Sequence, residues 1–343
     1  MKNKVLRNML IPGCVAVFAV FVPGVLISFD IIDAYTAQIL TLAGVNAIMA
    51  ISVNVVCGIT GQLSLGQAGF MAIGSYVTIV LTQTVGLPMP VSMVIAVLVT
   101  VICGILIGFP TLKLQGDYLA IVTLGFGEII RVILVNFKSI TGGANGLRFT
   151  TILAARADYA YFLVIGMLVV VIILLQNFVR STYGRAILAV REDEIAANSS
   201  GIDVFKNKMV GFAIASCIAG LGGALYAPFI GFVKPDLASF NRSIDYLIFV
   251  VLGGMGSVTG SVIAAFVLTY LQEFLRFLQD YRLLIYPLIL IFVMLFRPQG
   301  LLGMRELSFV KCWENFMAFI AKKKDNKKVS VVAASSEKEL NDD

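Results

Sequence analysis

The chain has 343 residues, of which 59% are hydrophobic and only 13% are charged. Ordinary soluble domains carry about 25% charged residues, so this composition excludes a soluble globular protein. A membrane β-barrel would need segments of about ten residues with alternating polarity, and no such segments occur. The fold class predicted from composition is therefore all-α, as a polytopic membrane helix bundle.

A helix crosses the apolar core of a bilayer with about 20 residues. Apolar stretches near this length predict about 8–10 transmembrane helices, some of them broken or re-entrant. They lie near 9–28, 37–57, 63–81, 89–109, 118–136, 159–178, 209–231, 244–260, 261–278 and 283–296. The first is expected to be a retained helix and not a cleaved signal peptide. The last three are the least regular, because glycines interrupt 244–260 and 283–296 is short.

The basic residues predict the orientation of the bundle. Placing the N-terminus in the cytoplasm puts most of the 26 Lys and Arg residues on the cytoplasmic side, and with ten crossings the C-terminus lies there too. The net charge of +6 thus reflects topology, and no folded basic domain for nucleic acid is present. The loops 140–147 and 232–243 then lie outside. They are either a contact for an external partner or ordinary connections.

The C-terminal segment 309–343 differs from the rest of the chain. Residues 309–320 alternate apolar and polar positions at helical spacing, which predicts an amphipathic helix at the membrane surface. The lysine-rich remainder is predicted to be disordered and cytoplasmic. It either contacts anionic membrane lipids or is simply a solvated end.

Small residues predict where helices approach each other closely. Gly211, Ala215, Ala219 and Gly223 form a ridge at four-residue spacing. In lipid such ridges mark helix–helix contacts. The contact is expected inside the chain, with packing against another subunit as the alternative.

No constellation for catalysis is found. The chain contains no histidine, which excludes a Ser-His-Asp triad and a histidine zinc site. It has no P-loop for ATP. The glycine-rich stretch 253–260 lies within an apolar segment and predicts a helix break, not a dinucleotide site. We therefore expect no catalytic residue, no metal and no cofactor in this chain.

Two groups of polar residues inside predicted spans are candidates for a translocation pathway. Five glycines between 58 and 76 accompany Gln62, Ser64 and Gln67. Irregular backbone at membrane depth is tolerated only when protein buries it or when it lines a watery cavity. These side chains therefore either face a pathway, as in a gate, or satisfy one another in tight packing.

Glu128 and Arg131 form the second group. Glu128 lies about 15 Å along its helix from Tyr118, near the middle of the bilayer. The i, i+3 spacing allows the two charges to pair, since both lie on one helical face. Intramembrane charges usually face the bundle interior. They are either an internal structural pair or part of the pathway, and Asn54 is a weaker case of the same kind.

Between two apolar stretches lies a polar segment, 180–208, that predicts a cytoplasmic helix with a break at Gly201. Such a helix suggests that a partner outside the membrane docks there and moves the bundle.

Four blocks, in order, resemble the permease subunits of branched-chain amino acid ABC importers. They are Gly61–Phe70, Gly116–Ile129, Thr141–Leu147 and Gly184–Lys208, and the likeness covers roughly 40–303. The run Arg191-Glu-Asp-Glu and the run Arg297-Pro-Gln-Gly-Leu look more like the second of the two paired permeases.

The resemblance implies that residues 1–308 are a permease domain that moves leucine, isoleucine or valine across the cytoplasmic membrane of a prokaryote. Its partners would be a second homologous permease, two cytoplasmic ABC ATPases that bind the ATP, and an extracytoplasmic solute-binding protein. The segment 185–203 would be the coupling helix.

ABC importers carry a Glu-Ala-Ala-x-x-x-Gly pattern in this coupling loop. Here Ala196, Ala197 and Gly201 match it, while Ile195 stands at the acidic position and the acid is one residue earlier, at Glu194. Arg185 and Arg191 complete the set of residues expected to couple the ATPases to the bundle.

Three alternatives remain open. The first is an ABC permease for another small solute, such as a sugar, urea or another amide. The second is an ion-coupled secondary transporter, for which Glu128 is the one deeply placed acid. A membrane-embedded enzyme is the third, although it lacks a nucleophile with a base or a metal site.

Overall fold

A computed structural model describes residues 24, 26–27, 33–114, 116–151, 157–297, 300–301 and 303. The chain in this part is almost entirely helical. The long helices are α2 (Ala34–Asn54), α3 (Gln67–Gln83), α4 (Met89–Thr111), α5 (Asp117–Asn136), α8 (Ala157–Arg180), α11 (Val204–Ile230), α12 (Phe240–Gly253), α13 (Val258–Phe274) and α14 (Arg282–Phe296). Every apolar stretch predicted from residue 37 onward therefore contains a helix, which confirms the all-α class.

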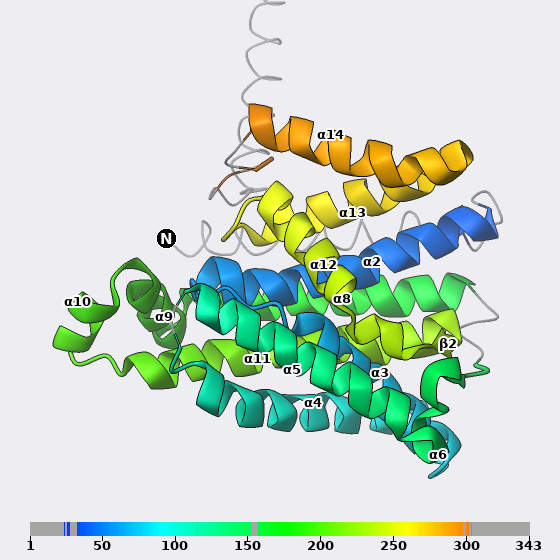
Figure 1. Ribbon diagram of the computed structural model, residues 1–343, viewed down its shortest axis with the longest axis horizontal. Helices are drawn as coiled ribbons and strands as arrows, with labels where there is room; N and C mark the ends of the chain where they lie inside the picture. The colour runs from blue at the N-terminus through cyan, green and yellow to red at the C-terminus, as the bar shows by residue number, and fades with distance from the viewer. Residues whose placement is uncertain are drawn as a thin grey trace, which may run out of the picture. The chain divides into compact units, whose positions relative to one another are not determined.

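Shorter elements join these helices. The π-helix η1 (Val55–Ile59) continues α2, and the polar helices α9 (Thr182–Glu192) and α10 (Glu194–Ser199) precede α11. The remaining short helices are α6 (Lys138–Thr141), η2 (Gly143–Asn145), η3 (Pro235–Ala238) and η4 (Leu275–Tyr281). The strands β1 (Leu147–Arg148) and β2 (Phe232–Val233) pair antiparallel, with Leu147 opposite Val233. Figure 1 shows α9 and α10 at one end of the bundle, and α6 and β2 at the other.

Within the described ranges, six helices are long and apolar enough to cross a membrane. These spans are Ala34–Ile59, Met89–Thr111, Asp117–Asn136, Asp158–Arg180, Val204–Ile230 and Val258–Gln279. The chain is thus a multi-pass membrane protein. Helices α3 and α12 are shorter, with 17 and 14 residues. The backbone leaves the helix at Gly254, where φ is +109°, so the helix break predicted for 253–260 is confirmed.

The centre of the described bundle is formed by α2 and α11. In the most apolar part of α2, 83% of the residues are buried, and in that of α11 61% are, against 28% in α4, α5 and α8. Helix α11 packs along α3, α4 and α2. The outer faces of α4, α5 and α8 carry exposed apolar side chains, as expected for helices that meet lipid or another membrane protein.

The small-residue ridge on α11 packs inside the chain. A Cβ at Gly223 would meet the backbone of α3, within 2.8 Å of the carbonyl carbon of Met71 and 2.9 Å of the nitrogen of Ser75. The Ser75 hydroxyl donates to the carbonyl of Gly223 at 2.9 Å. Earlier on α11, the carbonyl of Ala215 accepts a hydrogen bond from the Ser52 hydroxyl of α2 at 2.7 Å. The prediction of internal packing is confirmed.

Two predictions fall on parts of the chain that are not described. The apolar stretch 9–28 lies almost wholly outside the described residues, and so does the segment 309–343 with its amphipathic helix and its lysine-rich end. The division of the chain at residue 308 therefore stays a prediction.

We predict that Gly223→Ala lowers the thermal unfolding midpoint of the purified protein in detergent by several degrees. The added methyl group meets backbone atoms of α3, which cannot move aside as a flexible side chain would, and overpacking of this kind costs about 1–3 kcal/mol. Gly166→Ala on α8 is the matched control, because a Cβ there meets nothing within 4 Å. Equal midpoints for the two variants would contradict close packing of α11 on α3.

Candidate functional site

The polar segment forms two short helices, each started by a side-chain cap. Ser181 accepts from the N–H of Gly184 at the start of α9. The carboxylate of Asp193 accepts from the N–H groups of Ile195 and Ala196, which begins α10. One helix up to Gly201 was predicted, and this second cap is the physical reason why the helix is broken at Asp193 as well. The break at Gly201 itself is present, with φ at +81°.

The residues predicted to couple to a partner do not all face outward. Arg185 is exposed, and its guanidinium donates to the carbonyl of Arg180 and to the hydroxyl of Thr182, both nearby in sequence. In α10, Ala196 is exposed while Ala197 is buried. Glu194 forms an ion pair of 2.5 Å with Lys208, whose side chain is only 9% exposed. Glu194 therefore ties α10 to α11.

Ile195 is the most exposed apolar side chain of the polar segment, at 80%. It lies on α10 among exposed polar neighbours, and the buried Ile187 anchors the preceding helix α9. A single, largely exposed isoleucine on a polar helix is suited to insertion into a pocket of a partner protein.

Arg191 turns inward. Its guanidinium Nη1 donates to the carbonyl of Gly58 in η1 at 2.5 Å, and its side chain is 19% exposed. Asn54 lies one helical turn before Gly58, and its Oδ1 accepts from the N–H of Gly256 at 2.8 Å. The end of α2, the break after α12 and the polar helix α9 therefore meet at one place.

The segment between η1 and α3 is not helical, as its glycines and polar residues predicted. Gln62, Ser64 and Gln67 are at most 4% exposed. The Gln67 Oε1 lies 3.0 Å from the Ser52 hydroxyl, and the Ser64 hydroxyl lies 3.5 Å from the N–H of Gly66. Within the described part of the chain, neither amide atom of Gln62 has a hydrogen-bond partner. None of the three lines an open passage in this arrangement.

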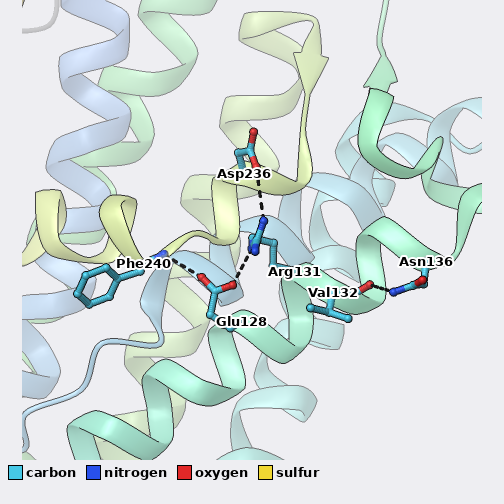
Figure 2. A network of polar contacts seen from close by, with 6 residues as sticks. All are labelled: Glu128, Arg131, Val132, Asn136, Asp236 and Phe240. Atoms are coloured by element: carbon cyan, nitrogen blue, oxygen red, sulfur yellow. Dashed lines mark hydrogen bonds and ion pairs between the residues drawn. The ribbon is translucent and has the colours of Figure 1, made fainter.

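Glu128 and Arg131 pair, as their spacing predicted. The carboxylate of Glu128 lies 2.6 Å from Nε of Arg131, whose Nη1 is 3.8 Å from Asp236 in η3. The other oxygen of Glu128 accepts from the N–H of Phe240 at 3.2 Å. Figure 2 shows how these groups connect α5 to the start of α12.

Glu128 serves as a cap for α12. The first N–H groups of a helix have no partner within it and carry partial positive charge. Ser239 precedes α12 but makes no side-chain cap bond. The carboxylate from α5 supplies the acceptor instead, and it fixes the depth at which α12 begins.

This network is not enclosed by the chain. The side chains of Glu128 and Arg131 are 35% and 37% exposed, and that of Asp236 is 76% exposed. Charges midway along a span do not face lipid without a large cost, about 2.5–3.5 kcal/mol each by insertion scales. Protein or water must therefore cover this side of α5. The two side chains pair within the chain, and their exposed sides lie at the surface of α5.

At the other end of the bundle, the paired strands frame a surface hollow. It is lined by Ala144, Asn145, Gly146, Arg148, Phe232 and Lys234. The two loops predicted to lie outside, 140–147 and 232–243, are thus joined by β1 and β2. Two basic side chains give the hollow a positive character.

Sequence reasoning missed the partners that come from distant segments. Asp236 and the N–H of Phe240 lie more than a hundred residues from Glu128, and the Gly58 carbonyl that binds Arg191 is a backbone atom. The glycine-rich composition around 58 and 256 was the available signal for such close backbone contacts. It did not indicate which segments would meet.

Comparison with known proteins gives one consistent family. Residues 35–294 match the family model of the branched-chain amino acid transport system permease component. The high-affinity branched-chain amino acid transport system permease protein LivM of Escherichia coli is 37% identical over 298 residues, covering 78% of this chain and 70% of that protein. The corresponding protein LivH of Escherichia coli is 24% identical over 293 residues, covering 79% and 95%. No solved structure matches the chain.

We predict that the Glu128–Arg131 pair shows coupling in a double-mutant cycle. Glu128→Ala and Arg131→Ala each leave a charge in the span, so each should lower the stability of the protein in detergent, and the double variant should lose less than the sum. At this exposure the coupling is expected to be about 0.5–1 kcal/mol. The pair Glu273–Arg276 has the same i, i+3 spacing, with Arg276 63% exposed, and serves as the comparison. Additive losses at Glu128 and Arg131 would contradict the pairing.

Proposed function

Because the chain belongs to the family of branched-chain amino acid transport system permease components, we propose that it is one of two paired permeases in an ATP-driven importer of leucine, isoleucine and valine. Two separate ATPases bind and hydrolyse the ATP. This chain provides half of the membrane passage and a surface through which the ATPases act on it.

The observation that carries this proposal is the pair of polar helices α9 and α10. They lie at the end of a bundle of membrane-spanning helices and present Ile195 and Arg185 outward. At the same time Arg191 and the Glu194–Lys208 pair attach them to α2 and α11. Helices that are exposed on one side and bonded to the bundle on the other are suited to transmit a force.

The orientation follows from charge. If α9 and α10 face the cytoplasm, Arg180, Arg185, Arg191, Lys206 and Lys208 are all on the side that favours basic residues in membrane proteins. Both termini then lie in the cytoplasm of a prokaryotic cell, and the hollow beside β1 and β2 faces outward. There Arg148 and Lys234 are placed to attract an acidic surface of a solute-binding protein that delivers the amino acid.

The partner of the open side of α5 is the second permease. Glu128 and Arg131 are too exposed in this chain alone for a position midway along a span. A paired permease would cover them and could enclose a water-filled route between the two chains. Relatives named LivM and LivH are both similar to this chain, which agrees with two permeases descended from one fold.

Within the chain, the non-helical segment around Gln62, Ser64 and Gln67 is the proposed inner gate, together with Asn54. These side chains are buried now, so they would line the route only after the segment moves. Glu128 is engaged by Arg131 and by the N–H of Phe240. Both carboxylate oxygens thus have partners within this chain, and we assign Glu128 a positioning role and not that of a coupling acid.

Affinity isolation of the tagged chain from its native membrane tests the proposal. Mild detergent and mass spectrometry should recover a second, related permease and one or two ATPases with P-loops. The variant Ile195→Glu should retain the second permease and lose the ATPases, because a buried charge replaces an apolar anchor. Recovery of the wild-type chain as a stable homo-oligomer without any ATPase would contradict the proposal.

A further inference from the structure

Arg191 occupies a notch that only glycines can form. A Cβ at Gly61 would lie 2.9 Å from its Cγ, and a Cβ at Gly256 would lie 3.1 Å from its Nη1. A Cβ at Gly58 would overlap Asn54 and the backbone of Gly256. The Arg191 side chain is therefore enclosed between the backbone at Gly61 and the backbone at Gly256.

The notch joins two interruptions of membrane helices. Gly58 lies in the π-helical end of α2, and Gly256 lies in the break between α12 and α13. The Asn54 side chain bonds one interruption to the other. A displacement of α9 would thus reach α2 through Gly58, and α12 and α13 through Gly256. By contrast, the bonds of Arg185 to described residues are to Arg180 and Thr182, close to it in sequence.

Polar atoms at the same place are left without partners. The amide nitrogen of Asn54 and both amide atoms of Gln62 are buried and unpaired among the residues that the structure describes. A buried polar group without a hydrogen bond destabilises a structure, because it has lost its bonds to water. π-helical turns are frequent at functional sites, where a helix has to change its winding. Unpaired buried amides and a π-helical turn are both expected at a joint whose helices can adopt a second conformation. In that conformation the amides would form hydrogen bonds.

We propose that Arg191 is the positioning residue that transmits movement of the coupling helix α9 to the joint formed by Gly58, Asn54 and Gly256. The proposal rests on the proposed function. Arg191 does not contact the ATPase or the amino acid. It binds α9 to the Gly58 carbonyl, and Asn54 links that end of α2 to Gly256. When the ATPases move α9, the end of α2 and the α12–α13 break therefore move with it, and Gln62 changes its surroundings.

The test compares ATP hydrolysis with uptake in the same samples. The complete importer is placed in proteoliposomes with wild-type chain, Arg191→Ala or Arg191→Lys. For Arg191→Ala the subunits should assemble and hydrolyse ATP at close to the wild-type rate, while uptake of labelled leucine falls about tenfold or more, in the range of coupling between distant sites. Arg191→Lys keeps one donor for the Gly58 carbonyl and should recover part of the uptake.

Lys113→Ala is the matched control, because it removes an exposed basic side chain whose contact is with the Phe109 ring of α4. It should leave both activities unchanged. If Arg191→Ala fails to assemble, Asn54→Ala provides the second variant, since it cuts the bond between the two interruptions and leaves Arg191 in place. Asn54→Ala should also hydrolyse ATP at close to the wild-type rate while its uptake of labelled leucine falls.

Two results would overturn the proposal. Parallel losses of hydrolysis and uptake in both variants would place these residues in ATPase docking or folding, and unchanged uptake in Arg191→Ala would show that the contact transmits nothing. Failure of the proposed function gives a different result, because then the wild-type preparation itself would show no ATP-dependent uptake.

Discussion

The bundle depends on the close approach of α11 to its neighbours. In lipid no hydrophobic driving force holds helices together, so contacts between backbones and interhelical hydrogen bonds must do so. Glycine at position 223 and alanine at 215 let serine hydroxyls of α3 and α2 reach the carbonyls of α11. These bonds form only at short distance. Larger side chains on this face of α11 would remove both the contact and the hydrogen bonds.

Because the centre of the bundle is tightly packed, we expect conformational change at the places where helices are interrupted. Helices α3, α4 and α11 are in contact along their length. In contrast, α2 ends in a π-helix, α12 is short and is followed by a glycine break, and the chain between η1 and α3 is not helical. Arg191 of α9 binds the Gly58 carbonyl in the first of these interruptions, and Asn54 links that site to Gly256 in the second. The geometry therefore separates a centre that keeps its packing from a joint where helices can be redirected.

Much of the fold could be predicted from the sequence because bilayer thickness and helical rise fix the length of an apolar segment. The Glu128–Arg131 pair was also predictable, since i, i+3 spacing alone brings the groups together. The partners that complete each site were not. Asp236 reaches Arg131 from another segment, and Gly58 binds Arg191 through a carbonyl that every residue possesses. The cap by Asp193 could have been read from its position before a short helical run, but it was missed because the alanine–glycine pattern favoured one continuous helix.

The central claim is that ATP hydrolysis by partner subunits drives transport through this chain. The most direct measurement is uptake of labelled leucine into proteoliposomes that contain the isolated importer, with ATP enclosed and the solute-binding protein outside. We expect leucine to accumulate with enclosed ATP and to fall to background without it. Accumulation by the purified chain alone, on an ion gradient and without ATP, would contradict the account.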